Sequence, residues 1–283
     1  MKTLTLVCWA ACMACLNLSG GDKDPMAASE ECLDCHDDVN EVLTLTVHNR
    51  ELKVSCIDCH GVTEAHLDDP DVGNIDNGKN AASMDRCLNC HESEIHQKSP
   101  GKNMHMAADV GCTGCHQIHH SKKKPVYPLL VAHQSQLCIS CHQDVRVQMA
   151  KPFTHKTENN VTECTSCHDP HGGRGRHSFK MHSMEATCAE CHPETRGPFA
   201  FTHVHGINGD CMTCHEAHGS SNPRQLTRAS VNQVCLECHS TLPMGNLGSQ
   251  PPATHNLRSI RYQNCTVCHT AVHGSSRSPV LLK

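Results

Sequence analysis

The sequence has very few aromatic residues: one tryptophan, two tyrosines and four phenylalanines, or 2% of 283 residues. Its mean hydropathy is -0.45. A chain of this length normally buries a substantial core, and aromatic side chains usually supply much of the apolar area of such a core. This chain cannot build an ordinary core, so we expect a bound group to supply the apolar interior.

The chain also lacks a basic stripe, and its formal net charge is -5. The only lysine run, at 122–124, is typical of a solvated linker, and nothing indicates a nucleic-acid partner. Beyond the first 20 residues there is no long apolar run. Residues 1–20 resemble an export signal that is too short for a membrane span. They also contain Cys8, Cys12 and Cys15, and Cys15 is an alternative site for lipidation.

Cysteine and histidine are abundant instead, with 23 and 26 residues. Outside the first 20 residues, every cysteine falls into one of ten C-x-x-C-H motifs, the pattern of covalent haem c attachment. Two thiols at this spacing can each form a thioether to one porphyrin vinyl group, and the following histidine can bind the iron from one face. The predicted attachment residues are Cys32, Cys35, Cys56, Cys59, Cys87, Cys90, Cys112, Cys115, Cys138, Cys141, Cys164, Cys167, Cys188, Cys191, Cys211, Cys214, Cys235, Cys238, Cys265 and Cys268. The predicted proximal ligands are His36, His60, His91, His116, His142, His168, His192, His215, His239 and His269.

Two other structures use closely spaced cysteines. Paired C-x-x-C motifs suit zinc ribbons, and an exported cysteine-rich chain can be a disulfide scaffold. Neither explains the histidine that follows all ten pairs. At the histidine content of this chain, ten such histidines by accident have a probability on the order of 10⁻¹⁰. We therefore predict ten covalently bound haems c.

The motifs alternate in a repeat. Odd-numbered motifs are CLDCH, CLNCH, CISCH, CAECH and CLECH, and an even-numbered motif follows each of them. We predict a single domain over residues 21–283 made of five two-haem repeats, at about 32–86, 87–137, 138–187, 188–234 and 235–283.

Two further histidines recur in every repeat, one before the even motif and one after it. Their number equals the number of open haem faces, which predicts bis-histidine ligation of every iron. The predicted distal ligands are His48, His66, His105, His119, His155, His171, His203, His218, His255 and His273. Six histidines fall outside this register and are expected to be surface residues, with His120 and His205 the closest rivals as ligands: His96, His120, His133, His177, His182 and His205. The methionines show no such register.

The fold class follows from the same counts. The sequence has little sustained helical periodicity, no run of alternating strands, and many Gly, Pro, Asn and Asp residues. We expect a multihaem c-type cytochrome, mostly irregular, with short α-helices around a linear chain of ten haems and little or no β-structure. Haem ligation would supply the stability, so the chain without haem should be unfolded.

One stretch, CTSCHDPHGG at 164–173, carries two histidines three residues apart. His168 belongs to the haem of its own motif. The Asp169–Pro170 bridge to His171 is short and stiff, so His171 should not reach the opposite face of that haem. We therefore expect His171 to bind a neighbouring haem, and the same for His119 and His218. His66 and His273 have longer spacers that allow other routes.

The stretch CHPETRGPFAFTHVHGINGDCMTCHEAHGS at 191–220, CTSCHDPHGG and the ten haem motifs resemble the MtrA/DmsE-type decahaem periplasmic c-type cytochromes of outer-membrane porin–cytochrome conduits. The resemblance covers the chain from about Glu31 to the last motif. It implies a haem wire, without a substrate-turnover site, in or against an outer-membrane β-barrel porin. The implied partners are periplasmic donor cytochromes and an outer-surface multihaem cytochrome or external acceptor. The implied location is the periplasm, in association with the outer membrane.

Two alternatives to the conduit remain. A multihaem reductase needs an iron with an open face and acidic or cationic groups beside it, but here the candidate ligands are numerous enough to fill every face. A subunit of an extracellular cytochrome filament would continue the haem row from copy to copy, and the haem pattern does not separate it from a conduit. A cell-surface reductase with β-sandwich domains is excluded, because no segment is long enough or strand-rich enough for such domains.

Overall fold

The structure is a computed structural model, and it describes residues 29–39, 46, 48, 52, 54–61, 64–70, 75, 84–92, 103–119, 129–155, 162–174, 177–203, 211–239 and 260–282. The predictions for residues 1–20, His96, His120, His205 and His255 lie outside these residues. The chain divides into two compact units, residues 1–75 and 76–283. Each unit is described by itself.

In the described part of the first unit, helices α1, α4 and α5 lie at or beside two haem motifs. Helix α1 (Glu30–Leu33) ends within the first motif, α4 (Cys56–His60) is the second motif, and α5 (Glu64–Asp68) carries His66. Ser55 and Asp58 form a capping box at the start of α4, where the Ser55 backbone N–H donates to Asp58 Oδ2 at 2.8 Å. The cap thereby fixes where the second motif becomes helical.

In the second unit, the odd motifs lie on true helices. We call them the helix-borne motifs, and they begin at Cys87, Cys138, Cys188 and Cys235. Their helices are α6 (Asp85–His91), α8 (Gln134–Cys141), α11 (Met184–Ala189) and α12 (Val231–His239). Leu, Ala or Glu occurs between the cysteines in most of them, and these residues favour helix.

The even motifs of the second unit lie on single turns that lead into loops. We call them the loop-borne motifs, and they begin at Cys112, Cys164, Cys211 and Cys265. Their turns are η5 (Cys112–Gly114), α10 (Cys164–Cys167), η7 (Cys211–Thr213) and η10 (Cys265–Val267). Thr, Gly, Ser or Val lies between the cysteines in each of them, and these are poorer helix formers.

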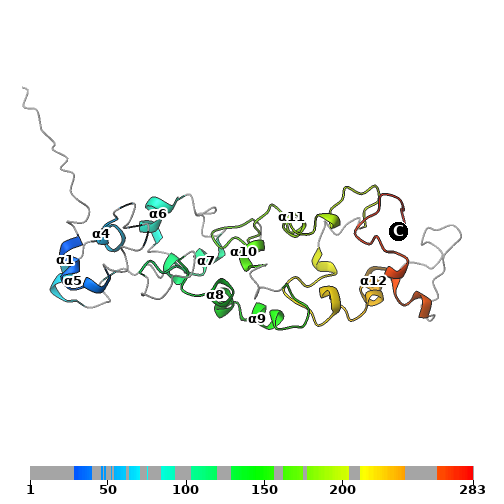
Figure 1. Cartoon of the computed structure of the whole chain (residues 1–283), viewed down its shortest axis with the longest axis horizontal. Coiled ribbons are helices and arrows are strands. Elements are labelled where there is room, and N and C mark those ends of the chain that lie inside the picture. The colour runs from blue at the N-terminus through cyan, green and yellow to red at the C-terminus, as the bar shows by residue number, and fades with distance from the viewer. Residues whose placement is uncertain are drawn as a thin grey trace, which may run out of the picture. The chain divides into compact units, whose positions relative to one another are not determined.

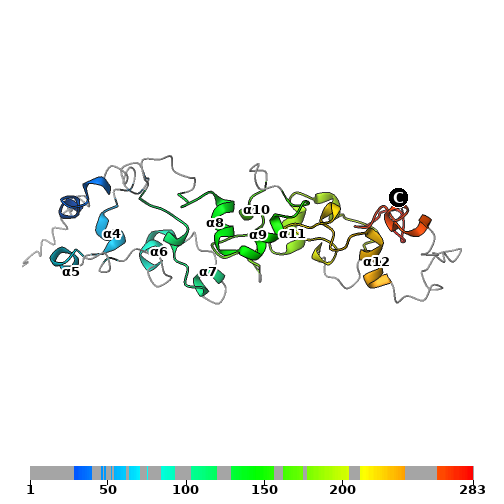
Figure 2. The same ribbon diagram turned by 90° about the horizontal axis from the view of Figure 1, so that it is seen from below.

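The remaining helical elements are short connectors. They are α7 (Met104–Ala107), α9 (Gln143–Met149), η6 (Pro193–Thr195), η8 (Pro223–Gln225) and η9 (Ile260–Tyr262). Figures 1 and 2 show these elements as isolated turns and helices joined by irregular segments. Within the described ranges, no helix is both long and apolar enough to cross a membrane.

The described residues contain no strand, only isolated β-bridges. Three of them close a loop behind a loop-borne motif, where a proximal histidine pairs with a residue 11 to 14 positions later: His116 with Leu130, His168 with Phe179 and His215 with Leu226. The prediction of a multihaem fold with short helices and little or no β-structure is confirmed.

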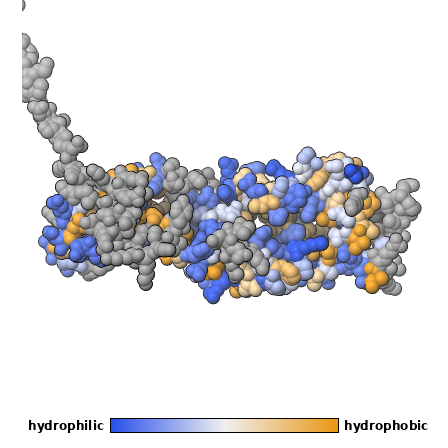
Figure 3. All heavy atoms as spheres, viewed as in Figure 1, coloured by the Kyte–Doolittle hydropathy of each residue, from blue (hydrophilic) through white to orange (hydrophobic). Residues whose placement is uncertain are grey.

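The described part of the chain has almost no apolar core. Met84 and Ala186, 4% and 5% exposed, are its only buried hydrophobic residues. Larger apolar residues reach the surface, among them Val147 at 68% and Val267 at 68%. Figure 3 shows apolar residues interspersed with polar ones on the visible face. As the aromatic content indicated, the polypeptide does not fill its own interior.

Candidate haem-binding sites

Seven pairs of histidine rings face each other across a narrow, constant gap. In each pair one ring ends a C-x-x-C-H motif and the other is a predicted distal ligand. The ring centroids are 5.9 to 6.4 Å apart in the pairs His36–His66, His116–His171, His105–His142, His168–His218, His155–His192, His215–His273 and His203–His239. The first pair lies within the first unit, and the other six lie within the second.

This separation suits two imidazoles on opposite sides of one metal ion. Imidazole nitrogen binds first-row metals at about 2.0–2.1 Å, and the ring centroid lies about 1 Å behind the nitrogen, so two axial ligands place their centroids about 6 Å apart. Direct ring stacking would bring the rings closer. The histidine pairs therefore fit bis-histidine haem.

His171 faces the proximal histidine of another motif. Its ring lies 5.9 Å from that of His116, which ends the preceding loop-borne motif. His168, three residues before His171, faces His218 at 6.1 Å instead. His66 and His273 likewise face proximal histidines of motifs other than the ones they follow. The predicted sharing of neighbouring haems agrees with this geometry, while the ligation itself remains a proposal.

Three distal histidines have pKa values below the ordinary histidine range. Burial is the main cause for His203, His218 and His273. The next cause in each case is the charge of the ring that the histidine faces: that of His239, His168 and His215, respectively. A lowered pKa keeps the imidazole neutral near pH 7, which metal binding requires.

The loop-borne proximal histidines are oriented by backbone carbonyls. The Nδ1 atom of His168 lies 2.7 Å from the carbonyl oxygen of His177, and that of His215 lies 2.9 Å from the carbonyl oxygen of Arg224. His269 Nδ1 makes the same contact with Val280 at 2.7 Å. A hydrogen bond of this kind places the proton on Nδ1 and directs the Nε2 lone pair toward a metal.

Three helix-borne motifs have the same support on the histidine that faces their proximal ring. His105 Nδ1 lies 3.2 Å from the Pro170 carbonyl oxygen, and His155 Nδ1 lies 2.9 Å from that of Ala217. His203 is hydrogen-bonded to the backbone of Val272. When these contacts are added to those of the loop-borne proximal histidines, each of the last six motifs has one histidine ring that is oriented by a backbone carbonyl.

The motif cysteines approach one another in sequence order through the second unit. Hydrogen bonds between thiols join the first cysteines of each helix-borne motif and the loop-borne motif after it, at Cys87–Cys112, Cys138–Cys164, Cys188–Cys211 and Cys235–Cys265. Each loop-borne motif also has a cysteine near enough to one of the next helix-borne motif for their charges to interact, at Cys115–Cys141, Cys167–Cys191 and Cys214–Cys235. The eight motifs of this unit thus follow one another from Cys87 to Cys265.

The thiol pairs shift the pKa values of their members. The hydrogen bond with Cys138 lowers the pKa of Cys164 to about 7, whereas the hydrogen bond with Cys164 and burial raise the pKa of Cys138. None of the twenty motif cysteines, all within the described residues, is in a disulfide. No cluster of three or more His, Cys, Asp and Glu side chains suited to a metal ion occurs in the described ranges.

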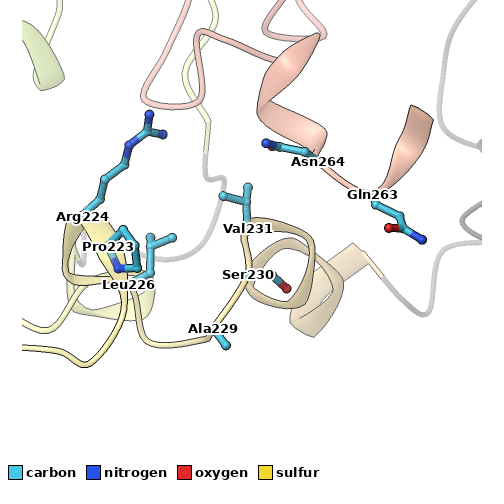
Figure 4. Close-up of a pocket in the computed structure, with 8 residues that line it drawn as sticks. All are labelled: Pro223, Arg224, Leu226, Ala229, Ser230, Val231, Gln263 and Asn264. Carbon is cyan, nitrogen blue, oxygen red and sulfur yellow. The ribbon is translucent and has the colours of Figure 1, made fainter. Parts of the chain in front are cut away.

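A cavity of about 380 Å³ lies among the last three motifs. Val231 is on the helix of one motif, Asn264 directly precedes Cys265, and the Arg224 carbonyl orients His215. Figure 4 shows Leu226 and Val231 as apolar walls, with Arg224 and Asn264 as polar groups around them. The lining thus combines apolar side chains with one cation, Arg224, and two amides.

The assignments of His48 and His119, and of the distal partners of His60, His91 and His269, stay predictions. The surplus histidines His133, His177 and His182 are exposed, as expected. The orienting carbonyls have no signal in the sequence, because any residue type supplies a carbonyl and only the fold decides which one faces a ring.

Comparison with known proteins agrees with this geometry. The family model "Doubled CXXCH motif" matches residues 105–147, 155–197 and 203–244, and "Cytochrome c554 and c-prime" matches 65–117. The chain is a multihaem c-type cytochrome with several covalently bound haems.

Among curated proteins, the chain is a homologue of the multiheme cytochrome MtrA of Shewanella baltica strain OS185. The two are 31% identical over 199 residues, which are 65% of this chain and 58% of that protein. The chain is also 27% identical over 133 residues to the cytochrome c-type protein NrfB of Escherichia coli O6:H1 strain CFT073, covering 44% of this chain and 69% of NrfB. The resemblance to MtrA-type cytochromes is thus confirmed, and the match spans less than two thirds of the length of MtrA.

Proposed function

We propose that the chain is an electron-transfer protein, a wire of ten bis-histidine haems without a substrate-turnover site. The observation that carries the proposal is the order of the motif cysteines, which lie near enough to interact, motif by motif, from Cys87 to Cys265. A wire needs this order, because electrons pass between neighbouring groups and a gap would stop them.

The residues serve the wire in three ways. When bound, each haem supplies an iron that takes up and releases one electron. Each pair of facing histidines would hold one iron with two imidazoles, which would leave no coordination position for a substrate. The backbone carbonyls at His155, His168 and His215 hold the imidazole rings in one tautomer and orientation. The cysteines fix each group beside the next.

Ligation by two histidines also influences the potentials. Axial ligand identity, hydrogen bonding to the ligands, burial and nearby charge set each haem potential. A carbonyl oxygen that accepts a hydrogen bond from Nδ1–H makes the imidazole a stronger electron donor to the iron, which favours the ferric state. Because such a contact occurs on the proximal side in one class and on the distal side in the other, we expect it to lower the haem potentials of both classes.

For the cellular setting, we propose export and a place in the periplasm, either with the signal at 1–20 removed or with a lipid on Cys15. The proposed partners are an outer-membrane β-barrel porin, periplasmic donor cytochromes and an outer-surface cytochrome or external acceptor. The support is the resemblance to MtrA. Such an assembly would carry electrons across the outer membrane.

The test is to purify the haem-loaded chain from membranes under conditions that keep complexes intact. We expect ten haems per chain by pyridine haemochrome assay and mass, low-spin ferric signals alone in electron paramagnetic resonance, and co-purification of a β-barrel protein. A stoichiometric high-spin haem in the intact protein would contradict the absence of a substrate site. Isolation as a fibre of identical chains would contradict the porin conduit.

A further inference from the structure

The distal ligands of haems in consecutive repeats lie in shared hydrogen-bonded segments. Pro170, Ala217 and Val272 each directly precede a distal histidine: His171, His218 and His273. The backbone of each of these three residues is also the partner of another distal histidine: His105, His155 and His203, respectively. The same contact therefore occurs three times in the described part of the second unit.

The two distal histidines in each case face different motifs. His155 faces His192, and His218 faces His168. His203 faces His239, and His273 faces His215. Each contact thus joins the distal side of a loop-borne haem to that of the helix-borne haem that follows it in the chain.

Pairs of backbone hydrogen bonds between the same segments reinforce two of the three contacts. Phe153 and Ser220 exchange two hydrogen bonds, of 3.1 Å from Phe153 N–H and 2.8 Å from Ser220 N–H. Phe201 and Ser275 exchange two in the same way, both of 2.8 Å. Phe153 and Phe201 begin the F-T-H segments that carry His155 and His203, while Ser220 and Ser275 end the H-G-S segments that carry His218 and His273.

The serine side chains are buried and engaged. Ser220, 3% exposed, donates its hydroxyl hydrogen to the Leu226 carbonyl oxygen at 2.6 Å and accepts from Asn222 N–H at 3.0 Å. Leu226 lies in the loop that closes behind His215. Ser275, 7% exposed, accepts from the backbone N–H groups of Arg277 and Ser278.

The glycine between histidine and serine allows the close approach. Gly219 has a φ of +151°, and a Cβ there would lie 2.4 Å from the Gln148 carbonyl oxygen. Gly274 has a φ of +147°, and a Cβ there would lie 2.1 Å from the Phe199 ring. A side chain at either position would push the H-G-S segment away from its neighbours.

We infer that each F-T-H segment and the H-G-S segment bonded to it form one ligand module that positions the distal histidines of two haems from consecutive repeats, with Ser220 and Ser275 as positioning residues. Displacement of one segment then disturbs both irons. Such a module fixes two neighbouring haems relative to each other at a repeat boundary.

The module also couples the electronic properties of the two haems. Lengthening the contact between His155 Nδ1 and the Ala217 carbonyl makes His155 a weaker electron donor to its iron, which raises the potential of that haem. Movement of Ala217 also moves His218 on the neighbouring haem. The inference rests on the bis-histidine ligation proposed above, which the haem count and low-spin spectrum of the unmodified protein test separately.

The experiment uses the full haem-loaded chain and first assigns the spectra. His155→Ala and His218→Ala each remove one distal ligand, so the low-spin signal that disappears identifies each haem of the module. Ser220→Ala is then compared with Ser220→Thr, which retains the hydroxyl, and with Ser221→Ala at the exposed neighbouring position. The readouts are the g-values of the assigned signals and the midpoint potentials.

We expect Ser220→Ala to retain all its haems, to shift both assigned signals together, and to change the reduction equilibrium of the His155-ligated haem a few-fold. A tenfold change would be about 59 mV for a one-electron couple. Ser220→Thr and Ser221→Ala should leave both signals in place. A shift in only one signal, or in neither, overturns the module.

Proline substitutions provide a second, backbone test. Phe153→Pro removes the N–H that donates to the Ser220 carbonyl, and Phe201→Pro removes the matching donor to Ser275. Phe153→Pro should shift only the spectral signals of the two haems that His155 and His218 face. Phe201→Pro should shift only the signals of the two haems that His203 and His273 face. Identical spectral changes in the two variants, or loss of all haems in both together with an unchanged Ser220→Ala spectrum, would contradict the inference.

Discussion

The helix-borne and loop-borne motifs contain the same five-residue pattern but are supported differently. Behind His168 and His215, the chain returns after nine residues and supplies the orienting carbonyl from its own loop. For the helix-borne motifs ending at His142 and His192, the orienting contact is on the distal histidine and comes from 62 to 65 residues away in sequence. The orienting contact of these loop-borne proximal rings is therefore local, whereas that of a helix-borne site joins a histidine of the preceding repeat to the loop-borne segment that follows the motif.

This difference matters for assembly. Local contacts form at a low cost in chain entropy, whereas the ends of a long segment must first be brought together. We expect the loop-borne proximal sites to be organised by their own sequence and the helix-borne distal sites to be completed only when the following motif has folded.

The first prediction removes one distal ligand from each class. His171→Ala and His105→Ala should each retain all covalent haems, because the cysteines and the proximal histidines His116 and His142 are untouched. Each variant should convert one low-spin haem to a five-coordinate or water-ligated high-spin haem, measured by electron paramagnetic resonance. His182→Ala, at an exposed surplus histidine, is the control and should leave the spectrum unchanged. A spectrum of His171→Ala without a high-spin signal would mean that His171 binds no iron.

The second prediction concerns the space beside a distal ligand. Gly219→Ala places a Cβ in a left-handed conformation 2.4 Å from the Gln148 carbonyl oxygen, so backbone must move. We expect a loss of about 1–3 kcal/mol in the free energy of unfolding, measured by thermal or denaturant unfolding. The matched control is Gly114→Ala in a loop-borne motif, where the nearest atom is the side-chain Cγ1 of Val110 at 3.2 Å. Equal losses in both variants would show that the approach at Gly219 is not special.

Much of this organisation could be predicted from the sequence. The C-x-x-C-H motifs specify haem attachment because thioether chemistry needs that spacing, and the regular positions of His155, His171 and His218 indicated distal ligands. The stiff Asp169–Pro170 bridge predicted that His171 serves another motif, and the structure places it at His116.

Other features could not be predicted in this way. The partner of His105 is the carbonyl of Pro170, and backbone carbonyls carry no sequence signal. The left-handed conformations at Ser178, Arg224 and Leu281 occur at residues that do not favour them. They follow from the closing of the loops behind the motifs, which is a tertiary effect.

The third prediction tests the support of a distal ligand within a loop-borne segment. Asp169 Oδ1 accepts a hydrogen bond from the backbone N–H of His171 at 2.9 Å. Asp169→Ala removes this acceptor and should cost about 1 kcal/mol in the free energy of unfolding, with a minor high-spin fraction at the haem faced by His171. Asp169→Asn keeps an acceptor at the same place and should restore most of the stability. If the Asn variant resembles the Ala variant, the charge of Asp169 matters and not its hydrogen bond.

The last and smallest effect is expected within a helix-borne motif. Ser183 is the N-cap of α11, and its hydroxyl oxygen accepts from the Ala186 backbone N–H at 3.0 Å. Ser183→Ala leaves this donor without its partner and should lower the free energy of unfolding by about 0.5–1 kcal/mol. Ser183→Thr retains the cap and should lose less. Because the cap starts the helix that presents Cys188, but touches neither histidine of that site, the low-spin spectrum should stay unchanged in both variants. A high-spin signal in Ser183→Ala would show that the helix-borne proximal site needs its local cap as well as its distant carbonyl, and the contrast between the two classes would then be weaker than the hydrogen bonds indicate.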